Sequence, residues 1–393
     1  MIKKMLKDAG QSIKYIDKIM LTAILILIGI GLLMIYSITS ISMYNGVEDS
    51  VYFVRKTVIA VLMGGFAMMF FSLISFKLLK LFGYVALLVC PPILMVTLLI
   101  GEGPAGSPVR SWIDFGFLSI QPAEFVKGGM ILALAFAMTK SMSLKLYDVK
   151  KWRDFKNARH FAFSFMGILL YVLLNLILIV LQPDMGTTII IFGIAAIMFL
   201  SSGVSIQSIG KLSFIAVLIA IPLYPLVVKG YMEERFDIWF DPFNHAKGLQ
   251  NVMGYTAIAL GGLFGVGIGN STQKYGYVIE PHNDFIVTIL AEELGVITVL
   301  LVMAIYFFIA MRCFLTAVKC DDKFGSLICI GVGALFLVQP VINLGGASGF
   351  IPLTGVTLPF ISYGGSSMMS TLLVMGLYFN VRLYTERKLR EKN

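Results

Sequence analysis

MLTAILILIGIGLLMIYSITS, residues 20–40, is an apolar run without a charged side chain, and runs of this kind decide the fold. About 20 apolar residues in a helix cross a bilayer core of roughly 30 Å. Such runs recur along a chain that is 58% hydrophobic and has a mean hydropathy of +0.89, far beyond a soluble globular domain. The first run is too long for a signal-peptide core and follows a charged leader without a small-residue cleavage site, so a retained span is expected. The chain is predicted to be an all-α polytopic membrane protein.

The runs predict about ten transmembrane helices in a single integral-membrane domain over residues 1–393, because no polar stretch is long enough to fold alone. The domain would have a cytoplasmic leader at 1–19, a large extracytoplasmic loop at 230–283 between the seventh and eighth spans, and a cytoplasmic tail at 383–393. The expected spans are 20–40, 57–76, 83–101, 121–139, 161–181, 187–203, 212–228, 284–312, 325–344 and 364–382.

Most of the 31 Lys and Arg residues lie on one side of this arrangement. They concentrate in the leader, in segment 140–159 and in the tail, which places both termini in the cytoplasm. This asymmetry accounts for the net charge of +9 without a nucleic-acid partner. The loops before Gln121, around Pro183 and at 230–283 and 345–363 then face away from the cytoplasm. The four cysteines show no metal-ligand spacing, and no disulfide framework is expected.

The stretch from Lys229 to Glu293 holds most of the conspicuous polar chemistry of a chain that is only 13% charged. Charge is costly beside a membrane core, so a concentrated set indicates a functional site. The alternative is an ordinary solvated loop, but solvation requires neither so many glycines nor the embedded apolar run. An extracytoplasmic site has no ATP or nucleotide sugar available, so its substrate must arrive already activated.

The segment GSPVRSWIDFGFLSIQPAEFVK, 106–127, enters a span with two charges on one helical face, Glu124 and Lys127. One interpretation is a self-neutralising buried pair. The other is an ammonium that meets a phosphate near the outer leaflet, oriented by Glu124. Arg110 would add a bidentate phosphate contact, or alternatively would extend to the membrane interface as a simple anchor.

LQPDMGTT, 181–188, joins two spans through a very short turn that contains Gln182 and Asp184. The carboxylate of Asp184 is expected either to cap the following helix or to shape a polar cavity and hold a basic side chain there.

The Gly-rich segment NVMGYTAIALGGLFGVGIGN, 251–270, is shorter than a full span and favours a re-entrant or interfacial helix followed by a turn. Gly265 and Gly267 would permit close backbone approach, for example to a lipid head group. Since no strand precedes this G-x-G pattern, a dinucleotide site is not indicated.

EPHNDFIVTILAEELG, 280–295, places Asp284 at the outer mouth of the eighth span, directly after Glu280 and His282. The carboxylate is either a helix cap or a general base whose pKa is raised by partial desolvation. At least one of Glu292 and Glu293, two turns deeper, is expected to face the bundle interior. The segment 343–367, which contains Ser362 and Tyr363, has the Gly/Pro content of a structured lid or re-entrant loop.

QPAEFVK, LQPDMGT, WFDPF with the following GLQ, PHNDFI with AEELG, and LTGVTLPFISYGGSS occur in this order along nearly the whole chain. Together these motifs resemble the SEDS family (shape, elongation, division and sporulation), the RodA/FtsW group of bacterial cell-wall proteins. The family's essential aspartate follows a His-Thr pair and maps onto Asp284. Asn283 stands where Thr is common and Ile279 where Pro is common, and neither change removes the carboxylate. The family's polar transmembrane pair maps onto Glu124 and Lys127.

The resemblance implies a peptidoglycan glycosyltransferase in the bacterial cytoplasmic membrane that polymerises lipid II into glycan strands at the outer face and releases undecaprenyl diphosphate. Its partner would be a class B penicillin-binding protein. Asp284 would accept the proton of the attacking 4-hydroxyl, while Lys127 and Arg110 offset charge on the departing diphosphate. His282, Glu280 and the Gly-rich backbone would position the saccharide.

Two other function classes are compatible with the same sequence features: a lipid II flippase and a non-catalytic scaffold of the synthase complex. The polar residues crowd toward the outer face, which favours catalysis there over a translocation path. No motif requires a cofactor or a metal ion, although a divalent cation bridging the diphosphate to Asp184 or Asp284 is compatible with the sequence. The short tail TERKLREKN slightly favours the elongation branch.

Overall fold

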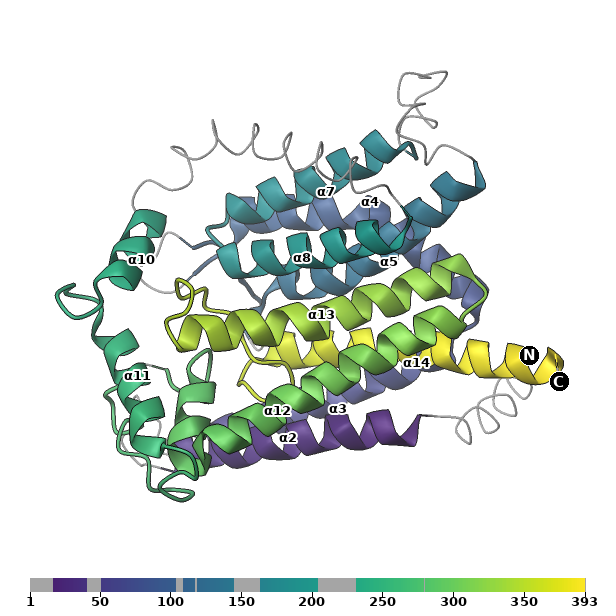
Figure 1. Ribbon diagram of the computed structural model, residues 1–393. Coiled ribbons are helices and arrows are strands. Elements are labelled where there is room, and N and C mark those ends of the chain that lie inside the picture. Colours follow the sequence, from purple (N-terminus) through teal and green to yellow (C-terminus); the bar gives the residue numbers. More distant parts are fainter. Residues whose placement is uncertain are drawn as a thin grey trace.

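The computed structural model describes residues 17–40, 51–103, 109–116, 119–144, 163–203, 231–278 and 280–392. Within these ranges the chain is a bundle of helices (Figure 1) with one small antiparallel hairpin of β1 (Ile113–Asp114) and β2 (Ser119–Ile120). The helices are α2 (Lys18–Thr39), α3 (Tyr52–Leu73), α4 (Phe76–Ile100), α5 (Pro122–Ser143), α7 (Phe165–Val180), α8 (Met185–Ser201), α10 (Tyr231–Phe240), α11 (Leu249–Gly261), α12 (Ile286–Lys319), α13 (Lys323–Ala347) and α14 (Gly365–Lys392).

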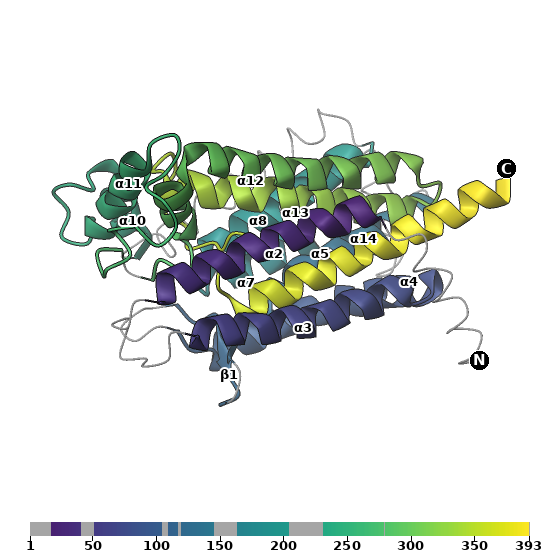
Figure 2. The same ribbon diagram turned by 90° about the horizontal axis from the view of Figure 1, so that it is seen from below.

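The all-α polytopic architecture predicted from the sequence is confirmed. Within the described residues, six helices are long and apolar enough to cross a membrane, namely α2, α3, α4, α5, α12 and α13, and α7 and α8 are shorter apolar helices. The seventh predicted span, 212–228, lies outside the described residues, as does most of the leader, so the number of ten spans stays a prediction. The last predicted span, 364–382, coincides with the first part of α14, which is one helix that continues through the expected tail to Lys392 and projects beyond the other helices (Figure 2).

The helix starts follow local capping rules. The side chains of Asp17, Ser75, Ser164 and Asp322 each accept a hydrogen bond from a backbone N–H in the first turn of the helix that follows. Pro122 occupies the first position of α5, where its missing N–H costs nothing. These caps fix where the polar loops end and the apolar helices begin.

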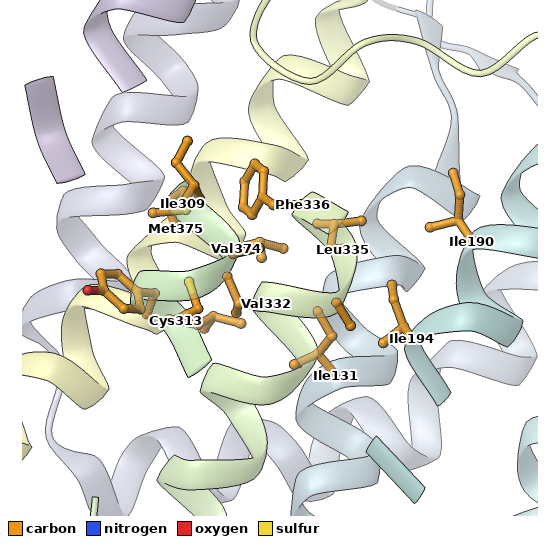
Figure 3. Packing of buried hydrophobic residues seen from close by; sticks show 14 of the residues in the cluster. Ile131, Ile190, Ile194, Ile309, Cys313, Val332, Leu335, Phe336, Val374 and Met375 are labelled. Atoms are coloured by element: carbon orange, nitrogen blue, oxygen red, sulfur yellow. The ribbon is translucent and has the colours of Figure 1, made fainter. Parts of the chain in front are cut away.

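Helix α13 lies at the centre of the bundle. Its Val332, Leu335 and Phe336 are buried among side chains of α5, α8, α12 and α14, as Figure 3 shows for Ile131, Ile190, Ile194, Ile309, Cys313, Val374 and Met375. Lipid tails are as apolar as these side chains, so helices associate in a membrane through close packing rather than through the hydrophobic effect. Small residues permit that packing: a Cβ on Gly331 would lie 2.7 Å from Ile131.

The two ends of the bundle are distinguished by different polar contacts. At one end, Asp17 of α2 pairs with Arg312 of α12 at 2.5 Å and accepts a hydrogen bond from Tyr378 of α14. At the other end, Ser37 of α2 donates to Glu293 near the start of α12. The β hairpin, the turn before α8, helices α10 and α11 and the loop before α14 all gather at this second end (Figure 1). The four loops that charge analysis placed on one side therefore do share one end, which is called the loop end below.

Helix α12 contains a break at Gly295, whose φ of 82° and ψ of 164° are not helical. The break exposes backbone groups of α12 to the Gly-rich segment that follows α11. Val266 N–H and Gly267 N–H donate to the carbonyls of Glu292 and Glu293, at 2.9 and 3.0 Å. The Gly-rich segment is thus paired with the interrupted helix, where several of its backbone polar groups are satisfied, and its re-entrant or interfacial position stays a prediction.

Replacing Gly295 with alanine is expected to destabilise the protein by about 2 kcal/mol or more, because a left-handed φ is strained for alanine. The new Cβ would also lie 2.2 Å from the carbonyl oxygen of Leu263. Gly29 is the matched control, since a Cβ there meets nothing within 4 Å and alanine favours a helix by up to about 1 kcal/mol. Thermal unfolding in detergent would compare the two variants, and equal midpoints would contradict the structural role of the break.

Candidate functional site

Asp284 lies in the turn that leads into α12, at the loop end of the bundle. Phe285 and not Asp284 is the N-cap residue of α12, and it makes no side-chain cap hydrogen bond. The Asp284 side chain is half-buried. Burial raises the pKa of Asp284 to about 6, against the lowering effect of nearby backbone N–H groups and the positive charge of Arg235, while Glu280 raises it further. A carboxylate with this pKa is ionised at neutral pH and can accept a proton there.

Arg235 and Trp239 hold α10 against the loop that precedes α14. The guanidinium of Arg235 donates to the carbonyl of Leu353 at 2.5 Å, and the indole N–H of Trp239 donates to the carbonyl of Gly349 at 2.8 Å. These contacts brace α10 against the loop that precedes α14. They also place the positive charge that acts on Asp284.

His282 packs among aromatic rings rather than pointing into solvent. Its ring lies 4.6 Å from that of Phe53 and 5.3 Å from that of Tyr363, centroid to centroid, and its carbonyl accepts the Tyr363 N–H at 2.9 Å. Burial lowers the pKa of His282 to about 4, so the imidazole is neutral at pH 7. His282 and Tyr363 therefore anchor the turn before Asp284 to α3 and to the segment before α14. Sequence analysis did not identify Phe53 as their partner.

Glu280 is exposed and has a positive φ of 50°. Asn283, which replaces the threonine common in the family, donates its side-chain amide to the Glu280 carboxylate at 2.6 Å. This hydrogen bond holds the acidic side chain of Glu280 against the residue next to Asp284.

Lys127 and Glu124 form a buried ion pair on α5, with Nζ and Oε1 2.8 Å apart. The ammonium also donates to Oε1 of Gln339 on α13 at 3.0 Å, and Glu124 accepts a hydrogen bond from Ser370 of α14 at 3.2 Å. Among the described residues, both charges are satisfied within the protein. The structure supports the self-neutralising interpretation for this state, and contact of Lys127 with a phosphate stays a prediction.

Asp184 caps the following helix, as one of the two interpretations of the sequence expected, and the polar cavity of the other interpretation stays a prediction. One carboxylate oxygen caps α8 by accepting the Thr187 N–H at 3.0 Å. The other accepts the side-chain amide of Gln121, the residue before α5, at 2.9 Å. Burial raises the pKa of Asp184. The turn before α8 is therefore tied to the start of the helix that carries Lys127.

Gln182 and Arg110 differ sharply in their surroundings. Gln182 is buried and donates to the carbonyl of Leu94 at 2.9 Å, and its own carbonyl accepts the hydroxyl of Ser111, so it braces α4 and the hairpin segment. Arg110 is exposed beside the bridge between Glu102 and Trp112. The structure does not bring Arg110 against the Lys127 pair in the described part of the chain, and its phosphate contact stays a prediction.

Gly265, Gly267 and Ser362 have backbone roles in the structure. A Cβ on Gly265 would lie 2.3 Å from the carbonyl oxygen of Glu293, and Gly267 donates to that same carbonyl. The close approach expected of these glycines is therefore made to α12. Ser362 closes the turn before α14 by accepting the Leu358 N–H at 2.7 Å. Binding of a lipid head group by these residues stays a prediction.

Three buried polar residues at this end were missed by sequence analysis: Lys274, Gln339 and Asn343. The segment VQPVIN, 338–343, could have indicated two of them, because it places an amide on each side of a proline inside an apolar span. Within the described residues, no three His, Cys, Asp or Glu side chains form a group that would hold a metal ion. The divalent cation compatible with the sequence stays a proposal.

Comparison with known proteins identifies the family. The profile of the family described as "Cell cycle protein" (FtsW, RodA and SpoVE) matches residues 18–387. A Bacillus subtilis protein named "Probable peptidoglycan glycosyltransferase FtsW" is 37% identical over 100% of this chain and 96% of its own length. "Stage V sporulation protein E" of the same organism is 32% identical over 94% of this chain and 97% of its own.

Two solved structures share the fold. A chain from a structure described as "Structural coordination of polymerization and crosslinking by a peptidoglycan synthase complex" superposes with a TM-score of 0.74 and 24% identity, covering 94% of this chain and 98% of that one. Thermus thermophilus "Rod shape determining protein RodA" gives a TM-score of 0.65 and 23% identity, covering 93% and 96%. Because the family profile spans almost the whole chain and the relatives match over their full length, the protein belongs to the FtsW/RodA/SpoVE family, as the motifs had suggested.

Proposed function

We propose that the protein is a peptidoglycan glycosyltransferase that polymerises lipid II into glycan strands at the outer face of the cytoplasmic membrane. The single observation that carries this proposal is Asp284, a half-buried carboxylate with a pKa of about 6 at the loop end of the bundle. One relative named peptidoglycan glycosyltransferase matches 100% of this chain, and others of that name match 93% to 96% of it. Their names favour the division branch over the elongation branch that the short tail slightly favoured.

The proposed reaction is one inverting displacement. Asp284 accepts the proton of a sugar 4-hydroxyl as that oxygen attacks the anomeric carbon of the donor, and the bond to the lipid diphosphate breaks. The diphosphate leaves with the electron pair as undecaprenyl diphosphate. We propose that Lys127 and Arg110 offset its charge, and that contact with Lys127 requires the ammonium to exchange one of its two partners, Glu124 or Gln339.

We further propose that the loop end faces away from the cytoplasm, that both termini are cytoplasmic, and that a class B penicillin-binding protein cross-links the strands. The arrangement of loops at one end supports this orientation. The synthase complex whose chain shares the fold supports such an assembly.

The decisive experiment incubates lipid II with the purified protein and its cognate class B partner and resolves the products by size. Glycan strands that a muramidase degrades are the expected result. If an intact complex makes no strands but moves lipid II across a liposome bilayer, the flippase alternative is correct. If the complex neither makes strands nor moves lipid II, the result supports the scaffold alternative.

The pH dependence of polymerisation follows from the pKa of Asp284. A base must be deprotonated, so kcat/KM is expected to rise as pH increases through about 6 and to level off above it. Arg235→Gln removes a positive charge and should move this midpoint upward, whereas Glu280→Gln removes a negative charge and should move it downward. Arg235→Lys keeps the charge and is the control. Shifts of the same sign in the two glutamine variants would show that another group titrates.

A further inference from the structure

Two amide side chains of α13, Gln339 and Asn343, connect the two charged parts of the proposed site through one loop. They stand one helical turn apart, on either side of Pro340, and both are buried. Gln339 donates to the carbonyl of Thr357 at 2.9 Å, and Asn343 donates to the carbonyl of Val356 at 2.7 Å. Two successive carbonyls of the loop before α14 are therefore held by successive turns of the central helix.

Each amide also contacts one charged part of the site. The side-chain oxygen of Gln339 accepts a hydrogen bond from the ammonium of Lys127 at 3.0 Å. The amide nitrogen of Asn343 makes a second donation, to the main-chain carbonyl of Asp284, at 2.9 Å. An amide is suited to both positions, because Gln339 uses an N–H donor and a carbonyl acceptor and Asn343 uses its N–H donors, and no apolar residue of similar volume provides these groups.

The network closes on itself through α14. The hydroxyl of Thr357 lies 2.7 Å from that of Ser367. The hydroxyl of Ser370 contacts the carbonyl of Ser367 at 3.1 Å and the carboxylate of Glu124 at 3.2 Å. The ring thus runs from the Lys127–Glu124 pair through α13 to the loop and through α14 back to Glu124, and Asn343 connects it to Asp284.

We propose that Gln339 and Asn343 are positioning residues that fix Asp284 relative to the Lys127–Glu124 pair through the shared carbonyls of Val356 and Thr357. This inference rests on the proposed function, because it assigns the base and the ammonium to opposite sides of one displacement. The base lies at the start of α12 and the ammonium on α5, so neither helix alone sets their separation. A displacement of about 1 Å in such a geometry lowers a rate by roughly 10²-fold.

Near-isosteric apolar substitutions test the proposal, namely Asn343→Leu and Gln339→Met, measured as lipid II polymerisation by the complex with its partner. Each is expected to lower kcat at least about 10-fold with KM changed less than about twofold, since positioning acts in the transition state. The double variant should lose little more than the more damaged single variant, because both residues act on the same loop. Independent structural damage would instead multiply the two losses.

Asn175 provides a matched control. It is equally buried, but among the described residues its amide donates only to the carbonyl of Tyr171 in its own helix, α7, at 2.8 Å. Asn175→Leu removes a buried amide away from the network and should leave kcat unchanged. A second test leaves the central helix unchanged. Thr357→Val removes the contact with Ser367 and should also lower kcat. This variant tests the network even if an α13 variant does not fold.

The outcomes separate this inference from the proposed function. Suppose that the wild-type complex makes strands and that Asn343→Leu and Gln339→Met make them at the wild-type rate. This result would overturn the positioning role and leave the proposed enzyme activity intact. Multiplicative losses in the double variant, or an equal loss in Asn175→Leu, would also overturn it. Absence of strands from the wild-type complex itself would contradict the proposed function instead.

Discussion

Replacing Asp284 with asparagine is expected to lower the rate of lipid II polymerisation by roughly 10²- to 10⁴-fold, the usual contribution of a general base. Asparagine matches aspartate in size but cannot accept the proton at neutral pH. The backbone contacts of this residue should survive, because its carbonyl still accepts the Asn343 amide. The measurement is kcat and KM for the complex with its partner, together with thermal unfolding. A large fall in kcat with an unchanged unfolding midpoint is expected.

Asp241 is the matched control for this substitution. It is an exposed aspartate at the same end of the protein, and its carboxylate contacts only the neighbouring Asn244 among the described residues. Asp241→Asn should polymerise lipid II at the wild-type rate. If Asp284→Asn also polymerised lipid II at the wild-type rate, the proposed glycosyltransferase activity would stand, but Asp284 would not be its general base. If both variants lost activity equally, the loss would reflect the total negative charge at the loop end and not a specific role of Asp284.

The positions of several helices along the chain could be predicted from the sequence because span length is a local property. An apolar run such as residues 20–40 forms a helix whichever neighbour it meets, and an aspartate before an apolar run, such as Asp184, caps the helix from within its own turn. Asp284 was likewise proposed from its position at the mouth of a predicted span, and its role as the base stays a prediction. Its raised pKa was also anticipated from partial burial.

The contacts between distant segments could not be predicted in the same way. AEELG reads as a continuous helix, and only the folded chain shows that Gly295 interrupts it so that the Gly-rich segment can pair there. Gln339 reads as an isolated polar residue until Lys127 and Thr357 are placed beside it. A period of 3.6 residues identifies which residues share a face, but it does not say which other helix that face meets.

The buried pair of Lys274 and Glu293 is such a contact, and it provides the prediction with the largest effect on stability. Nζ and Oε1 are 2.7 Å apart, and both side chains are almost wholly excluded from solvent. Ser37 of α2 donates to the carboxylate at 2.7 Å and accepts from the ammonium at 3.0 Å. The pair therefore joins the loop after α11 to α12 and α2, directly beside the break at Gly295.

Lys274→Met is expected to destabilise the protein by about 3–5 kcal/mol, because it leaves the carboxylate of Glu293 buried without its cation. Lys388→Met is the control: that lysine pairs with Glu391 on an exposed helix face, where ion pairs contribute little, so no measurable change is expected. Chemical unfolding in detergent would compare the variants. Hydrogen exchange at 262–278 would show whether this segment is released first.

The double variant Lys274→Met/Glu293→Leu distinguishes an unpaired charge from lost packing. Replacing a whole buried pair by apolar side chains of similar volume is often neutral or stabilising, because both desolvation costs are removed together. Most of the stability lost in Lys274→Met should therefore return. If the double variant were instead as unstable as Lys274→Met or less stable, the loss would reflect packing and the hydrogen bonds of Ser37 with this site, and an unpaired charge would not be its cause.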